Sequence, residues 1–251
     1  MALMARRLVQ LYVGLALYGF GIALQVASTL GNDPWDVFHE GLARRFGLTI
    51  GLWIIIAGAV VMLAWIPLRQ RPGLGTVSNV VLVGAFADLF LWLLPEPGSL
   101  AARWTFLVAA IVVGGFATGC YIGAGLGPGP RDGLMTGLAA RGHSLRVVRT
   151  GIELTVLTLG WLLGGTVGVG TLLYALAIGP LAHVFLPMLR IGEPGAGPAR
   201  PSGESVAVTV TVPGTEAKAS REDPLEGTPE GTPAGTADGT AEGTLPEPAR
   251  G

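Results

Sequence analysis

The sequence has very little cysteine and lysine, and it lacks the common catalytic motifs. Cys120 is the only cysteine, which excludes an internal disulfide and a thiolate metal site. The only lysine is Lys218, in the last fifth of the chain, so the preceding residues hold no GxxxxGK[ST] phosphate-binding loop. HExxH and GxSxG motifs are absent, and the three histidines are scattered. We therefore expect no metal, no cofactor and no enzymatic activity.

Charge is also scarce, and it is unevenly distributed. Only 13% of the 251 residues are charged, about half the share of an ordinary soluble domain. Residues 8–32 and 104–130 carry no charge at all, and uncharged apolar runs above about 18 residues are long enough to cross a bilayer as a helix. No basic patch with interleaved aromatics is present, so no nucleic-acid partner is expected. The pattern predicts an all-α polytopic membrane protein that lies in a lipid bilayer.

Six segments have the length and composition of transmembrane helices. Tryptophans lie near several of their ends, where amphipathic rings favour the headgroup level. The fifth segment is the shortest and contains Arg149 and Glu153, four positions apart, which can neutralise each other on one helix. The predicted spans are Leu8–Leu30, Leu48–Leu68, Thr76–Leu94, Trp104–Leu126, Arg146–Leu163 and Thr171–Leu189.

The membrane part is internally duplicated. A shift of 96 aligns residues 19–45 with 115–141, and a shift of 95 aligns 73–94 with 168–189. The shared Gly-x-x-Pro-x-Asp pattern is not a product of membrane composition alone. We expect one repeat at 1–94 and a second at 95–191, each with three spans. An odd number of spans inverts the second repeat relative to the first.

The arginines give these repeats an orientation. With the N-terminus inside, eight arginines fall in cytoplasmic segments and three in outer loops, in agreement with the positive-inside rule. Both termini are then cytoplasmic. Residues 192–251 differ in character, with acidic side chains in excess and Gly-Thr recurring every four positions from Gly227 to Thr244. This composition predicts a disordered tail.

Each repeat contains a helix break after its first span. Gly31 to Asp36 interrupt the first repeat, and Gly127 to Asp132 interrupt the second. Asp36 or Asp132 can cap the short helix that follows each break, at 37–45 and 133–141. Such interrupted segments in matching places are the best sequence indication of a transporter site. Interfacial helices with ordinary loop capping remain the alternative, which His39, Glu40, Arg44 and Arg45 favour in the first repeat.

Ionisable side chains inside the predicted spans supply further candidates, because charge in a bilayer usually faces a cavity or a partner. Asp88 lies in the third span, and its repeat counterpart is His183 in the sixth. They could form a central pair, or they could lie near opposite interfaces. The candidate substrate-binding residues are Asp36, Asp132, Arg131, Asp88 and His183.

Small residues recur every four positions along the first and fourth spans, which lets backbones approach closely. We expect the stripes at Gly19 and Gly115 to face each other or a common central partner. A Gly-x-Gly-Thr sequence precedes the third and sixth spans, and its threonines, Thr76 and Thr171, are expected to act as N-caps.

These elements together resemble a known family. The Gly-x-x-Pro-Trp-Asp element, the Gly-Pro-Gly-Pro-Arg-Asp-Gly-Leu-Met stretch and the Gly-x-Gly-Thr turn are similar to those of the YitT/YczE-like bacterial membrane proteins, over roughly residues 7–190. The resemblance implies a multi-spanning bacterial inner-membrane protein. It implies no catalytic residues.

Two functions fit the sequence. The first is a small-solute transporter or permease, with a solute or a coupling ion bound at the two breaks, acting alone or as a homo-oligomer. The alternative is a non-catalytic scaffold or accessory protein that packs against a partner complex. A transporter should enclose a polar cavity that reaches the breaks, whereas a scaffold should be packed solid.

Overall fold

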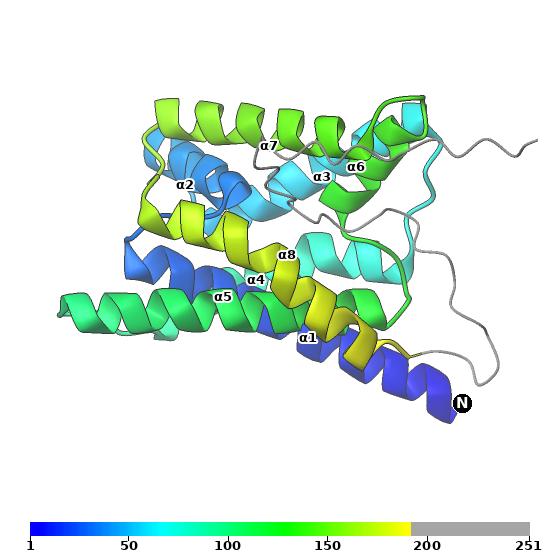
Figure 1. Cartoon of the computed structure of the whole chain (residues 1–251), viewed down its shortest axis with the longest axis horizontal. Coiled ribbons are helices and arrows are strands. Elements are labelled where there is room, and N and C mark those ends of the chain that lie inside the picture. The colour runs from blue at the N-terminus through cyan, green and yellow to red at the C-terminus, as the bar shows by residue number, and fades with distance from the viewer. Residues whose placement is uncertain (192–251) are drawn as a thin grey trace, which may run out of the picture. The chain divides into compact units, whose positions relative to one another are not determined.

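The computed structural model describes residues 1–191, so the predicted disordered tail lies outside the described residues. Within this range the chain forms helices only (Figure 1). The helices are α1 (Ala2–Ser28), α2 (Pro34–Phe46), α3 (Ile50–Leu68), α4 (Leu74–Leu93), α5 (Leu100–Gly123), α6 (Pro130–Ala139), α7 (Leu145–Leu162) and α8 (Val169–Leu189).

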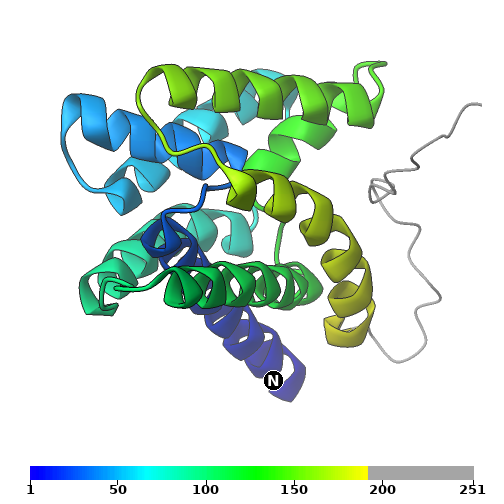
Figure 2. The same cartoon turned by 60° about the vertical axis from the view of Figure 1, so that its left-hand side comes forward.

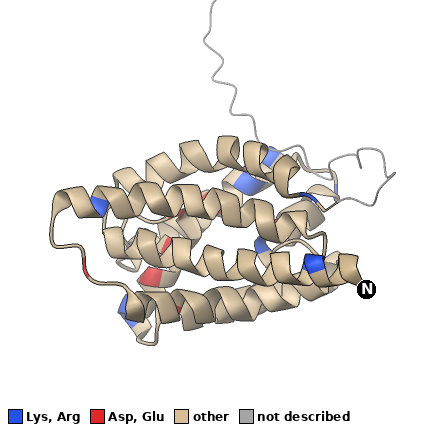
Figure 3. Ribbon diagram, turned by 90° about the horizontal axis from the view of Figure 1, so that it is seen from below, with Lys and Arg blue, Asp and Glu red and all other residues tan. Residues whose placement is uncertain are grey.

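Five of these helices, α1, α3, α4, α5 and α8, are long and apolar enough to cross a membrane. Charged side chains are sparse along the ribbon (Figure 3). Large apolar residues are exposed on the outer helices, among them Leu162 on α7 and Met188 on α8, as expected for surfaces that face lipid. The prediction of an all-helical membrane protein is confirmed. Helix α7, the fifth predicted span, is 18 residues long and carries three charged side chains.

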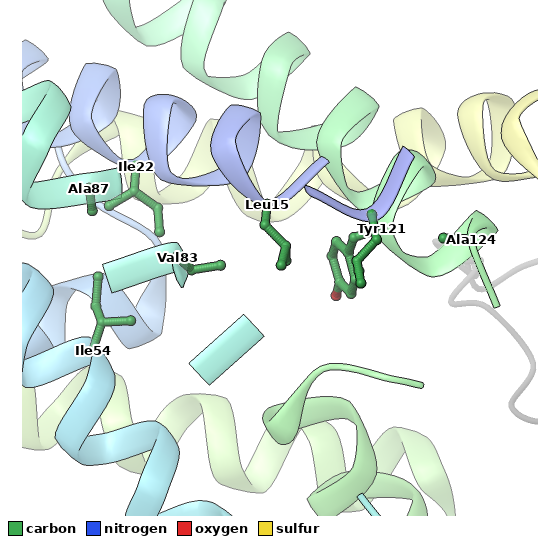
Figure 4. Close-up of a cluster of buried hydrophobic side chains, with 8 residues drawn as sticks. Leu15, Ile22, Ile54, Val83, Ala87, Tyr121 and Ala124 are labelled. Carbon is green, nitrogen blue, oxygen red and sulfur yellow. The ribbon is translucent and has the colours of Figure 1, made fainter. Parts of the chain in front are cut away.

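The hydrophobic core lies between α1, α3, α4 and α5 (Figure 4). Leu15 and Ile22 of α1 belong to one buried cluster with Ile54 of α3 and Val83 of α4, and Tyr121 extends the cluster from α5. Helix α1 packs most extensively against α5. The two helices approach closely at Gly14, because this residue has no Cβ; a Cβ there would lie only 2.8 Å from Cys120 Cβ.

The small-residue stripes do not face each other, which corrects the prediction. Gly19 lies against Phe86 of α4, whereas Gly115 and Gly119 lie against Leu181 and Phe185 of α8. Each stripe therefore packs on the last helix of its own half. The physical reason is that α1 and α5 meet through another face, which includes Gly14 and Gly21.

The two halves make equivalent main contacts, and the largest difference between them concerns their last two helices. Helix α1 packs on α4 as α5 packs on α8, and α2 packs on α7 as α6 packs on α3. Helix α3 also packs along α4, but α7 and α8 have no comparable contact (Figure 2). The second half therefore lacks a helix contact that the first half has.

Candidate functional site

The first helix break positions a carboxylate at the start of α2. The chain leaves α1 through Thr29, turns at Gly31 with φ of 119°, and enters α2 at Pro34. Asp33 is the N-cap, and its Oδ1 accepts a hydrogen bond from the Asp36 N–H at 2.7 Å. The prediction that Asp36 caps this helix is wrong. Proline fits the first helical position, because it needs no N–H partner, and this places the cap one residue earlier, at Asp33.

The second break has the same backbone path but a different cap. Gly127 has φ of 126°, and α6 begins at Pro130 with Gly129 as N-cap, which has no side chain to accept a hydrogen bond. Asp132 is the third helical residue, as Asp36 is in α2, so the prediction that it caps α6 is also wrong. Instead, its Oδ2 accepts a hydrogen bond from the Tyr121 hydroxyl at 3.1 Å.

Each break is held by the Gly-x-Gly-Thr turn of the other half. The N–H of Gly170 donates to the Leu30 carbonyl at 2.8 Å, and the N–H of Gly75 donates to the Leu126 carbonyl, also at 2.8 Å. We call this pair of contacts the reciprocal clasp. It places each break beside the turn of the other half; the first break is mostly buried there, and the second is partly exposed at Pro128.

The threonines of these turns lie inside their helices rather than at the N-cap, contrary to prediction. Thr76 Oγ1 accepts a hydrogen bond from the Gly73 N–H and donates one to the Pro128 carbonyl at 2.8 Å. Thr171 Oγ1 accepts one from the Gly168 N–H at 3.2 Å. The threonines thus stabilise the clasp, because the glycines at the N-cap positions have no side-chain oxygen.

Helix α2 is anchored by a buried glutamate. Both oxygens of Glu40 accept hydrogen bonds, from the Asn32 amide, from the N–H and hydroxyl of Thr166, and from the guanidinium of Arg44. Arg44 also donates to the Gly164 carbonyl at 2.7 Å. His39 and Glu40, whose polarity favoured an interfacial helix, are thus buried within the protein.

Charged residues from the two breaks meet beside this anchor. Arg131 of α6 lies 3.8 Å from Asp36 Oδ1 and 4.0 Å from Asp33 Oδ2, so its guanidinium pairs loosely with both carboxylates. Its Cζ is 4.8 Å from the centre of the Trp35 ring, a cation–π distance. Trp35 and Arg131 are repeat-equivalent positions, and their contact means that the first turns of α2 and α6 face each other.

A small cavity of about 60 Å³ adjoins this cluster, with room for a few water molecules. It is lined from the first half by Tyr18, Trp35 and His39, and from the second by Tyr121, Arg131 and Asp132, among others. Within residues 1–191, three buried polar atoms of the first break have no hydrogen-bond partner. They are Asn32 Oδ1, Trp35 Nε1 and Asp36 Oδ2.

Burial shapes the ionisation of the acidic pair. It raises the pKa of Asp33 to about 6, an effect that the Asp36 charge reinforces. It also raises the pKa of Asp36 to about 6, although the Arg131 guanidinium opposes the rise. Burial lowers the pKa of His39 well below its usual value, so the ring is neutral. Its Nδ1 lies 3.1 Å from Asp36 Oδ1 and donates to that oxygen when the carboxylate is ionised.

The structure brings together three of the five candidate residues, Asp36, Arg131 and Asp132. Asp88 lies elsewhere, on α4, and its carboxylate accepts hydrogen bonds from the Thr49 hydroxyl and the Gly51 N–H at the start of α3. His183 is exposed on α8. No hydrogen bond or ion pair joins Asp88 to His183, and α4 does not pack on α8 to any comparable extent.

Sequence reasoning missed other members of the cluster, chiefly Asp33, Trp35 and Tyr121. Asp33 had a readable signal, since Asp directly before Pro is a common helix start. Tyr121 had none, because a tyrosine inside an apolar run is usually a packing residue.

Comparison with known proteins gives relatives along most of the helical part. The model of a family described as "Family of unknown function (DUF6198)" matches residues 5–187. The chain is 41% identical over 177 residues to an uncharacterized protein of Haemophilus influenzae, covering 70% of this chain and 81% of that one. It is 38% identical over 179 residues to the uncharacterized membrane protein YczE of Bacillus subtilis, covering 70% and 83% respectively. No solved structure matches.

Proposed function

This chain belongs to the family of unknown function DUF6198, and from that premise we propose that it transports a small solute through a site where its two helix breaks meet. It is a multi-pass membrane protein with a membrane-protein relative. The proposal adds that it lies in the bacterial inner membrane with both termini cytoplasmic. As a transporter it carries out no chemical conversion of the solute.

One observation supports this proposal above the others, namely the loose contact of Arg131 with Asp33 and Asp36 beside a cavity that both breaks line. Burying charge is costly unless the groups are fully paired. A scaffold gains nothing from incomplete pairing and should be packed solid, so the cavity favours transport over the scaffold alternative.

The reciprocal clasp supports the inverted-repeat part of the proposal. Three crossings in each half require α7 to span together with α3, its repeat counterpart. The exchanged hydrogen bonds of Gly170 and Gly75 are what a pseudo-two-fold axis between the halves produces. In inverted-repeat transporters the substrate site lies near such an axis, and the contact of Trp35 with Arg131 meets that condition.

The side between α7 and α8, which do not pack along each other, is the proposed access to this site. Helix α7 carries a half-exposed pair, Arg149 and Glu153, joined at 2.8 Å. The charge of Arg149 is within electrostatic reach of Asp132 and Tyr174, which belong to α6 and α8. Polar groups therefore lead from the partly exposed surface of α7 towards the cluster.

Metabolite profiling of cells with and without the gene tests the proposal, followed by complementation with variants. Asp36→Asn and Arg131→Gln should both lose the solute change while the protein still inserts and folds. Glu96→Gln is the matched control, because Glu96 is an exposed acid between α4 and α5. If the gene changes a solute level but Asp36→Asn and Arg131→Gln complement like the control, the site is not used and the scaffold reading replaces the proposal.

A further inference from the structure

Asp36 is the most deeply buried acid of the cluster, with 1% of its surface exposed. Oδ1 contacts His39 and Arg131, but Oδ2 has no hydrogen-bond partner within the described part of the chain. An ionised carboxylate oxygen without a donor is strongly disfavoured in a protein interior. A bound proton removes this charge and lowers the cost of the unpartnered oxygen.

The charges around Asp36 also call for an additional positive charge. Asp33 and Asp36 carry two negative charges when ionised, against the single positive charge of Arg131, while Glu40 is paired with Arg44. His39 is neutral and cannot compensate. The ionisable groups near Asp36 are Asp33, His39 and Glu40 on its own side, Arg131 from α6, Tyr18 from α1 and Tyr174 from α8. Asp132 and Tyr121 line the cavity beside it.

A metal ion is a poorer fit than a proton. Among residues 1–191, no group of three or more His, Cys, Asp or Glu side chains is arranged to hold a metal. The two break carboxylates, Asp33 and Asp36, each have one oxygen turned to Arg131. Two buried acids that share one guanidinium are a usual arrangement for retaining a proton, because both cannot ionise without cost.

We propose that Asp36 and Asp33 together bind one exchangeable proton and that this proton is the coupling ion of the transporter, an inference that rests on the proposed function. The proton comes from water and forms an O–H bond with a carboxylate oxygen, Oδ2 of Asp36 being the one free to take it. Asp36 thereby loses its charge, and Arg131 keeps only Asp33 as an ionised partner. Because Arg131 belongs to the second half and both acids to the first, protonation loosens the electrostatic link between the halves.

The tryptophan beside the pair provides a readout that needs no solute. Arg131 lies over the Trp35 ring, so a change of charge at Asp36 alters the field at that indole. The experiment records fluorescence of the purified full chain in detergent from about pH 4 to about pH 9, and subtracts the same titration of Trp35→Phe. We expect one transition with its midpoint near pH 6.

The variants decide whether the carboxylates carry the transition. Asp36→Asn should abolish it or shift it by more than about one pH unit, and Asp33→Asn is the second variant should Asp36→Asn fail to fold. Glu96→Gln should leave it unchanged. Proton release measured with an indicator dye in weakly buffered detergent gives an independent count, in which the wild type should release about one proton more than Asp36→Asn between pH 5 and pH 8.

A flat titration of the wild type, or a transition that both Asn variants retain, would overturn the proton site. These outcomes leave the transporter proposal standing, because they do not involve the solute. Conversely, if the transition behaves as expected but solute levels ignore Asp36→Asn, the transporter proposal fails and the proton has no coupling role.

Discussion

The reciprocal clasp predicts that Gly31 and Gly127 cannot be replaced even by alanine. Gly31 has φ of 119° and Gly127 has φ of 126°, a backbone conformation in which any residue with a Cβ is strained. A Cβ on Gly31 would lie 2.6 Å from the Gly168 nitrogen, and a Cβ on Gly127 would lie 2.8 Å from Thr76 Oγ1. Either substitution must therefore push the facing turn away and lengthen the hydrogen bonds of the clasp.

The size of the effect follows from these two terms. An unfavourable backbone conformation costs about 1–3 kcal/mol, and a lost buried hydrogen bond about 1 kcal/mol more. We expect a loss of about 3 kcal/mol for each variant, which lowers the melting temperature by roughly 6–12 °C in a protein of this size. Cys120 is the only cysteine and is buried, so a thiol-reactive dye reports unfolding of the purified protein in detergent.

Gly151→Ala is the matched control. A Cβ on Gly151 would meet nothing within 4 Å, and the residue lies inside α7. Alanine there should leave the melting temperature unchanged or raise it, because alanine favours a helix by up to about 1 kcal/mol over glycine. Should Gly31→Ala and Gly127→Ala melt with the control, the clasp does not hold the breaks as described.

Three further predictions test other parts of the structure. Glu40→Gln weakens four hydrogen bonds to a buried charge and should cost about 2 kcal/mol, seen as a lower melting temperature with the dye. Burial raises the pKa of Asp36 from 3.8 to about 6, so the free energy of unfolding of the wild type should fall by up to about 3 kcal/mol as pH rises from 4 to 6 and then stay constant. The Asp36→Asn variant should show a smaller fall over the same range. Equal stability of the wild type at pH 5 and pH 8 would contradict this prediction. In a cysteine-free background, Arg45→Cys should react with an impermeant reagent from outside and His143→Cys only after permeabilisation, whereas labelling of both from one side would rule out the inverted repeat.

Much of the fold could be predicted because a bilayer imposes simple requirements on sequence. Uncharged runs of the right length give the spans, and Gly-Pro clusters mark the breaks, since those residues end helices whatever surrounds them. The short helices could also be located, although proline in the first turn makes them begin at Pro34 and Pro130, three residues earlier than predicted. These features depend on local chemistry, which a single sequence contains.

The roles of individual acids could not be predicted, because they depend on which helix end lies nearby. Asp88 looks like an intramembrane charge in sequence, yet it accepts hydrogen bonds at the start of α3. The Gly-x-Gly-Thr turn looks like a simple helix start, but its glycines let the turn approach a break of the other half. Such contacts join residues that are at least 37 positions apart, and local patterns do not specify them.

The comparison of two acids on α2 separates structural from functional burial. Glu40 and Asp36 are four residues apart, so they lie one turn from each other on the same face. Glu40 uses both oxygens and connects α2 to the segment before α8, as an acid that stabilises a fold should. Asp36 is more deeply buried, yet it leaves one oxygen unpaired and contacts its arginine only loosely. Since α2 already has a satisfied anchor one turn away, the incomplete pairing of Asp36 supports the proposal that its charge changes during transport.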